Sequence, residues 1–144
     1  MRECIVVGVD NTANRLAEYL PPTDSYQGTP GVGDKYRDYL LNNVRPYLNA
    51  TYRTLTDPAN TLTGGSSMGG LIALYLGRAT TNFGRIAVMS PAFWVAPNFM
   101  AQVRAGLLPA LAQSLDCERY HMFTGHPYLS RIASHVSRTS DLSR

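Results

Sequence analysis

A glycine-rich segment between two apolar runs constrains this chain more than any other feature. Residues 64–70 read Gly-Gly-Ser-Ser-Met-Gly-Gly and directly follow the short run Thr61-Leu62-Thr63. An apolar run over 71–76 comes next, and Gly77 follows it. We therefore expect a strand over 61–63, a sharp turn through the glycines, and a helix over 71–76 that ends at Gly77.

Further strands and helices extend this alternation. The β-branched run 4–9 is typical of a strand buried on both faces of a parallel sheet, and 85–90 is a second such run ended by Pro91. A helix is expected to begin at Asp34, and another to cover 100–115. Strands that alternate with helices predict an α/β fold with mainly parallel strands.

The helix after Asp34 contains a proline. Its apolar stripe continues past Pro46, which predicts a kink or a break near Val44 and Arg45. Before this helix, residues 12–33 form a long connection rich in proline and glycine. Such a connection is either a functional loop or a surface excursion, and the sequence leaves both open.

Composition and charge exclude several classes of protein. The 144 residues suit one domain, and 16% charged residues exclude a disordered chain. A net charge of +3 without a Lys/Arg run argues against nucleic-acid binding, and no apolar stretch is long enough to cross a membrane. We expect a cytoplasmic protein with a core over 1–115 and an atypical tail over 116–144. Of the two cysteines, Cys4 is expected to be a reduced core residue.

The segment Gly65-Ser66-Ser67-Met68-Gly69 matches the pattern G-x-S-x-G, which is typical of a nucleophile elbow. The elbow holds its central serine on a strained strand-to-helix turn, and we expect side chains at 65 and 69 to collide with neighbouring backbone. The N–H of Met68 would point at a developing oxyanion. Two alternatives remain: a phosphate-binding glycine loop, and glycines that serve only helix–sheet packing.

Several segments together resemble the putative-esterase family of α/β-hydrolases, which includes S-formylglutathione hydrolases, feruloyl esterases, trilactone esterases and mycolyltransferases. The resemblance covers about residues 4–95 and rests on these motifs: Val6 to Asn11, Arg15 with Glu18-Tyr19, Pro46-Tyr47, Tyr52-Arg53, Gly64 to Tyr75, and Met89-Ser90-Pro91-Ala92-Phe93-Trp94. It implies a partial three-layer α/β-hydrolase sandwich with a mainly parallel sheet. Residues 4–9, 61–66 and 85–90 would be its strands, and Ser67 its nucleophile.

The resemblance also implies partners for Ser67. The chain order Ser67, Asp116, His126 matches the order nucleophile, acid and base. A serine nucleophile needs such partners because an unassisted hydroxyl is a poor nucleophile. His121 and His135 are the other histidines. Phe93 and Trp94 would either line an acyl pocket or pack in the core. Arg15 and Glu18 would either lie near the site or form an ion pair that orders the loop.

These residues predict a serine esterase that hydrolyses a small-molecule carboxylic ester through an acyl-enzyme on Ser67. No cofactor is expected, and no cluster has the spacing of metal ligands. The alternative is a truncated, non-catalytic homologue that acts as a scaffold or oligomeric binding module. Family members carry strands ahead of the run 4–9, and open sheet edges favour a homo-oligomer.

Overall fold

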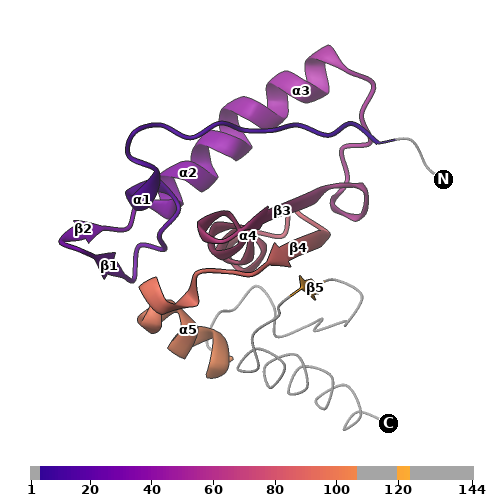
Figure 1. The fold of residues 1–144 in the computed structure, drawn as a ribbon. Helices are drawn as coiled ribbons and strands as arrows, with labels where there is room; N and C mark the ends of the chain where they lie inside the picture. Colours follow the sequence, from indigo (N-terminus) through magenta and orange to yellow (C-terminus); the bar gives the residue numbers. More distant parts are fainter. Residues whose placement is uncertain (1–3, 107–119, 124–144) are drawn as a thin grey trace, which may run out of the picture.

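A three-stranded parallel sheet forms the centre of the molecule. The computed structural model describes residues 4–106 and 120–123. Strands β3 (Leu62–Ser66), β4 (Arg85–Met89) and β5 (Tyr120–Phe123) lie in that order and are all parallel (Figure 1). Helix α4 (Met68–Ala79) connects β3 to β4 and packs against both. The predicted α/β architecture with a parallel sheet is confirmed.

The other elements precede β3 or follow β4. They are, in chain order, α1 (Arg15–Glu18), β1 (Ser25–Tyr26), β2 (Thr29–Pro30), α2 (Gly33–Tyr39), a π-helix (Leu40–Val44), α3 (Arg45–Thr51), a 3₁₀ turn (Pro58–Asn60), a second 3₁₀ turn (Phe93–Val95) and α5 (Pro97–Arg104). The long connection 12–33 thus contains a short helix and a two-stranded hairpin. Strands β1 and β2 form a hairpin whose two loop residues, Gln27 and Gly28, both have positive φ, as a type I′ turn requires.

Pro46 changes the helix locally instead of breaking it. The helical run from Gly33 to Thr51 widens to a π-helix over Leu40–Val44 and returns to α-helix at Arg45. A proline has no N–H to donate and its ring clashes with the carbonyl four residues earlier, so a wider turn just before it relieves both problems.

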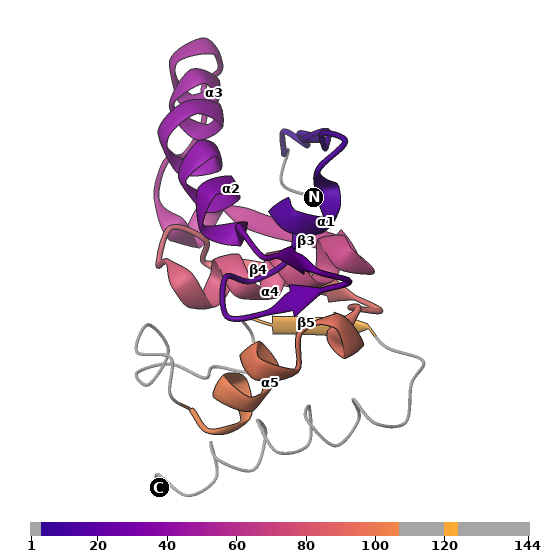
Figure 2. The same ribbon diagram turned by 90° about the vertical axis from the view of Figure 1, so that its left-hand side faces the viewer.

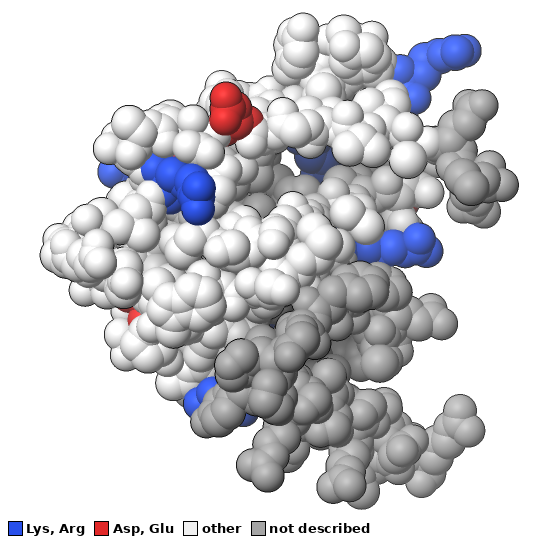
Figure 3. All heavy atoms as spheres, viewed as in Figure 1, with Lys and Arg blue, Asp and Glu red and all other residues white. Residues whose placement is uncertain are grey.

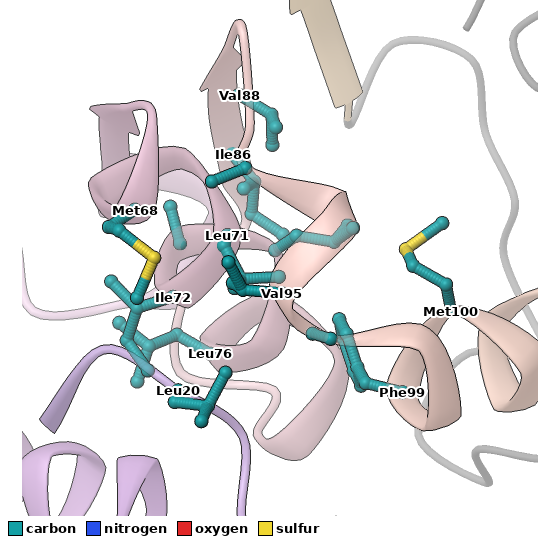
Figure 4. Packing of buried hydrophobic residues seen from close by; sticks show 14 of the residues in the cluster. Leu20, Met68, Leu71, Ile72, Leu76, Ile86, Val88, Val95, Phe99 and Met100 are labelled. Atoms are coloured by element: carbon teal, nitrogen blue, oxygen red, sulfur yellow. The ribbon is translucent and has the colours of Figure 1, made fainter. Parts of the chain in front are cut away.

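The core lies between α4 and one face of β4. Leu71, Leu76, Ile86 and Val88 are almost completely buried there, together with Leu20 from the loop after α1 (Figure 4). Gly77 does not end the helix as predicted. A Cβ at Gly77 would lie 1.7 Å from Ile86 Cδ1, so this glycine is a packing position inside α4 that makes room for β4.

Residues 4–9 are not the buried inner strand that their composition predicts. They form no strand, and Ile5 and Val6 are 54% and 88% exposed. Cys4 is exposed as well. Figure 2 shows the segment beside α1 and away from α3. Within the described residues β3 pairs with β4 alone, and the run 4–9 does not pair with the free edge of β3, so no ladder buries it.

The sheet instead takes its third strand from the segment that we expected to be a tail. The backbone of β5 pairs with β4 in parallel, with Ile86 opposite Tyr120 and Met89 opposite Phe123. The backbone of 120–123 therefore belongs to the sheet, although these residues fall in the segment 116–144 that we expect to be an atypical tail. The sequence of 120–123 has no periodicity that predicts a strand, because the position of β5 depends on pairing with β4.

Candidate active site

Ser67 occupies a strained turn between a strand and a helix. It follows the last residue of β3, precedes the first residue of α4, and is exposed. Its backbone angles are φ 56° and ψ −121°, a region that residues with a side chain rarely adopt. Strain of this kind costs about 1–3 kcal/mol and persists where the surroundings enforce it.

Three backbone hydrogen bonds enforce the conformation of Ser67. Its N–H donates to Met89 O at 3.0 Å, which continues the β3–β4 ladder. Its carbonyl accepts from Leu71 N–H inside α4 and from Ala92 N–H beyond β4, both at 3.1 Å. The peptide groups of Ser67 are thus bonded to the strand, to the helix and to the segment after β4, and the hydroxyl is left outside this network.

The glycines around Ser67 contribute unequally. A Cβ on Gly65 would lie 2.5 Å from Gly69 O, which confirms the predicted collision two residues before the serine. A Cβ on Gly69 would meet nothing within 4 Å, so the prediction for the position two residues after is wrong. Gly70 is the tighter site, since its Cβ would lie 2.9 Å from Met89 O. The close approach therefore involves one glycine on β3 and one on α4.

The N-terminus of α4 supplies hydrogen-bond donors beside Ser67. Met68 is the first residue of this 12-residue helix, so its N–H has no acceptor within the helix. Backbone N–H groups at a helix N-terminus carry partial positive charge and favour an anion. The Met68 side chain itself is buried, and only its backbone can serve a substrate.

Ser66 differs from Ser67 in position. It is the last residue of β3 and pairs with Met89 across the ladder. It is exposed, but its φ is not in the positive region, and it does not directly precede the helix. The strained position therefore belongs to Ser67, as the motif register predicts.

The predicted acid and base lie outside the described residues. This applies to Asp116 and His126, and also to His135. The backbone of His121 lies on β5 opposite Ala87, and its side chain is outside the description. The pairing of Ser67 with a histidine therefore stays a prediction.

Phe93 and Trp94 have different surroundings. Both lie on the 3₁₀ turn that follows Ala92, whose N–H is bonded to Ser67. Phe93 is half-buried and packs against the core, whereas Trp94 is 72% exposed. Trp94 is therefore available for contact with another molecule.

Arg15 and Glu18 do not form the ion pair considered above. The Glu18 carboxylate accepts hydrogen bonds from Thr12, at 2.6 Å from the hydroxyl and 3.4 Å from the N–H. In the described part of the chain, the salt bridge is between Arg37 and Asp38. Glu18 thus orders the start of the connection through Thr12.

Sequence reasoning missed Asp24. This carboxylate is 4% exposed and accepts hydrogen bonds from the N–H groups of Asn98 and Phe99, each at 2.8 Å. These two amides belong to the first turn of α5. Because Asp24 and Asn98 are 74 residues apart, no local pattern could have revealed the contact.

Charged side chains are sparse on the face of the molecule that Figure 3 presents. Figure 3 shows a mostly uncharged face with isolated charged side chains and a hollow in its upper part. Among residues 4–106 and 120–123, no three His, Cys, Asp or Glu side chains gather where they could hold a metal ion. No helix in this described part is long and apolar enough to span a membrane.

Comparison with known proteins identifies the family of this chain. A search of curated proteins returns no match. A family model described as Putative esterase matches residues 1–125, which include the β3–α4 turn and all three strands of the parallel sheet. Family membership supports ester hydrolysis in general terms. The chain belongs to the Putative esterase family.

Proposed function

We propose that the protein is a serine esterase that hydrolyses small-molecule carboxylic esters, with Ser67 as the nucleophile. The observation that carries this proposal is the exposed Ser67 at φ 56°, bonded through its backbone to β4, α4 and the segment after β4. An ester carbonyl that approaches the hydroxyl also approaches the free N–H groups at the start of α4.

The proposed reaction has two steps. Ser67 Oγ attacks the acyl carbon while a histidine, by preference His126, takes its proton and passes it to the departing alcohol oxygen. Asp116 orients that histidine, and the Met68 N–H stabilises the oxyanion. Water then attacks the acyl-enzyme carbon, returns the proton to Ser67, and releases the carboxylic acid.

Ester turnover tests the assignment directly. With p-nitrophenyl acetate, Ser67→Ala should lower kcat by about 10⁴-fold or more, since removal of a nucleophile eliminates the covalent route. Ser66→Ala is the matched control and should retain activity within about tenfold. Equal activity of wild type and the Ser67→Ala variant would contradict the proposal and favour the scaffold alternative.

Histidine substitutions identify the base. His126→Ala should lower kcat by about 10³-fold or more, while His121→Ala and His135→Ala should change it far less. A large loss in another histidine variant would keep the serine mechanism and reassign the base.

A further inference from the structure

One segment joins the Ser67 turn to the start of α5. We call residues 92–99 the connecting arm. At its near end the Ala92 N–H donates to the Ser67 carbonyl at 3.1 Å. The arm then forms the 3₁₀ turn Phe93–Val95 and enters α5 at Pro97. A displacement of the arm would therefore act on the residues next to Ser67.

Asp24 fixes the far end of the arm. Its Oδ1 accepts from the Asn98 N–H, and its Oδ2 accepts from the Phe99 N–H and from the Thr23 hydroxyl, all at 2.8 Å. The Asn98 amide nitrogen also donates to the Thr23 carbonyl at 3.1 Å. The residue that precedes α5 is Ala96, whose side chain cannot accept a hydrogen bond, so Asp24 caps this helix from a distant part of the chain.

Asp24 is itself held in place. Its N–H donates to the Pro21 carbonyl at 3.0 Å, and its carbonyl accepts from the Gly31 N–H at 2.9 Å. A Cβ at Gly31 would lie 2.1 Å from Pro21 O, so the two sides of this loop are in close backbone contact. Leu20, next to Pro21, is fully buried. These contacts fix the position of Asp24, and through it the start of α5.

Trp94 lies between the two anchors. The neighbouring Val95 and Ala96 are buried, which fixes the backbone, whereas Trp94 is 72% exposed. An indole offers a large apolar surface at small cost in conformational entropy, which suits contact with an apolar ligand. We infer that Asp24 is a positioning residue, which holds the arm so that Trp94 contacts the apolar part of an ester at Ser67. This inference rests on the proposed function of Ser67.

Fluorescence tests the anchor without any need for activity, because Trp94 is the only tryptophan in the chain. Asp24→Ala alone leaves the part-buried amide of Asn98 and the buried amide of Phe99 without this acceptor, so we combine it with Ala96→Ser, which supplies a cap to α5 locally. In this double variant the thermal midpoint should return toward that of wild type, while the time-resolved anisotropy of Trp94 should fall. Anisotropy equal to that of wild type would overturn the anchoring role. If the double variant does not fold, Asp24→Asn, which keeps one acceptor oxygen, is measured with the same criteria.

Two controls accompany this measurement. Ala96→Ser alone shows whether the buried position tolerates serine. Asp57→Asn makes the same chemical change as Asp24→Asn at an exposed carboxylate that accepts hydrogen bonds from the Asn60 side-chain amide. Asp57 precedes the 3₁₀ turn Pro58–Asn60, and the Gly84 N–H donates to the Pro58 carbonyl just before β4 begins. Asp57 therefore lies at the opposite end of the sheet from Ser67. Its anisotropy should equal that of wild type.

Substrate selectivity tests the contact with the ester. The ratio of kcat/KM for p-nitrophenyl hexanoate to that for the acetate should fall about tenfold in Trp94→Ala. The ratio should fall in the Asp24→Ala/Ala96→Ser variant as well, through a higher KM for the hexanoate. When Trp94→Ala is added to that variant, the total loss should equal the loss in Trp94→Ala alone, because Asp24 acts through Trp94. Additive losses, or an unchanged ratio in Trp94→Ala, would overturn the inference. A wild type that lacks Ser67-dependent activity would instead refute the proposed function, which the anisotropy measurement does not need.

Discussion

Residues 4–9 and strand β4 are both short runs rich in β-branched and small apolar residues, yet they differ in burial. In β4, Ile86 and Val88 are completely buried, and the strand pairs with a neighbour on each side. In the run 4–9, Ile5 and Val6 are largely exposed, and within the described residues no strand pairs with it. Apolar composition alone therefore does not place a segment in a sheet; a neighbouring strand and a covering helix do.

Hydrogen exchange should show the largest contrast between these two segments. Amides of 86–88 are bonded on both sides of a central strand, so they should exchange only when the whole fold opens. Amides of 5–9 should exchange at least about 10³-fold faster, given a typical global stability of about 5 kcal/mol or more. Exchange measured by mass spectrometry or NMR checks this, and similar protection of both segments would show that 4–9 is paired in solution.

Truncation of side chains sharpens the same comparison. Ile86→Ala should lower the free energy of unfolding by about 2–5 kcal/mol, because the side chain is completely buried. Val6→Ala should change it by no more than about 0.5 kcal/mol, since this residue is 88% exposed. Denaturant titration measures both. Gly77→Ala should partly restore stability to the Ile86→Ala protein, because its Cβ fills the vacated space.

Gly65 and Gly69, which lie on either side of Ser67, allow a matched test within the sheet region. Gly65→Ala should cost about 3 kcal/mol and greatly reduce ester hydrolysis, since its Cβ would lie 2.5 Å from the Gly69 carbonyl oxygen. Gly69→Ala meets no atom within 4 Å and places alanine in a helix, so stability should be unchanged or rise by up to about 1 kcal/mol. Equal losses in the two variants would contradict the one-sided close approach described above.

The stability of the protein should depend on alkaline pH through Tyr36 on α2. Burial, with a smaller contribution from the neighbouring Tyr19, raises the pKa of Tyr36 above its usual value near 10. The stability contributed by neutral Tyr36 is therefore fully present below about pH 10 and is lost as the pH rises above that value. Tyr36→Phe should make the unfolding midpoint less sensitive to pH between about 9.5 and 11. An unchanged pH dependence would mean that Tyr36 ionises as freely as in the unfolded chain.

The features that sequence predicted well are those whose contacts are local. The glycine spacing and the helix start at Ser67 depend on local contacts, because a Cβ on Gly65 would meet Gly69 O and the Leu71 N–H donates to the Ser67 carbonyl. The features that sequence missed depend on distant partners. Gly77 looks like a helix end in the sequence, because Ile86, which occupies the space beside it, lies on the next strand.

Two further misses have the same cause. Strand β5 acquires its place by pairing with β4, and its four residues carry no periodic signal. Asp24 caps a helix 74 residues away, although it sits in a loop that the sequence marks only by its prolines and glycines. Long-range pairing and capping thus set the limit of what pattern reasoning could predict here, and they decide burial for 4–9 as well.

Covalent labelling of the nucleophile tests the central claim most directly. The protein is treated with a fluorophosphonate, and the modified peptide is located by mass spectrometry in wild type and in the Ser66→Ala and Ser67→Ala variants. We predict one adduct on Ser67 in wild type and in Ser66→Ala, and none in Ser67→Ala. An adduct on another residue, or equal labelling of all three proteins, would contradict the assignment of Ser67 as the esterase nucleophile.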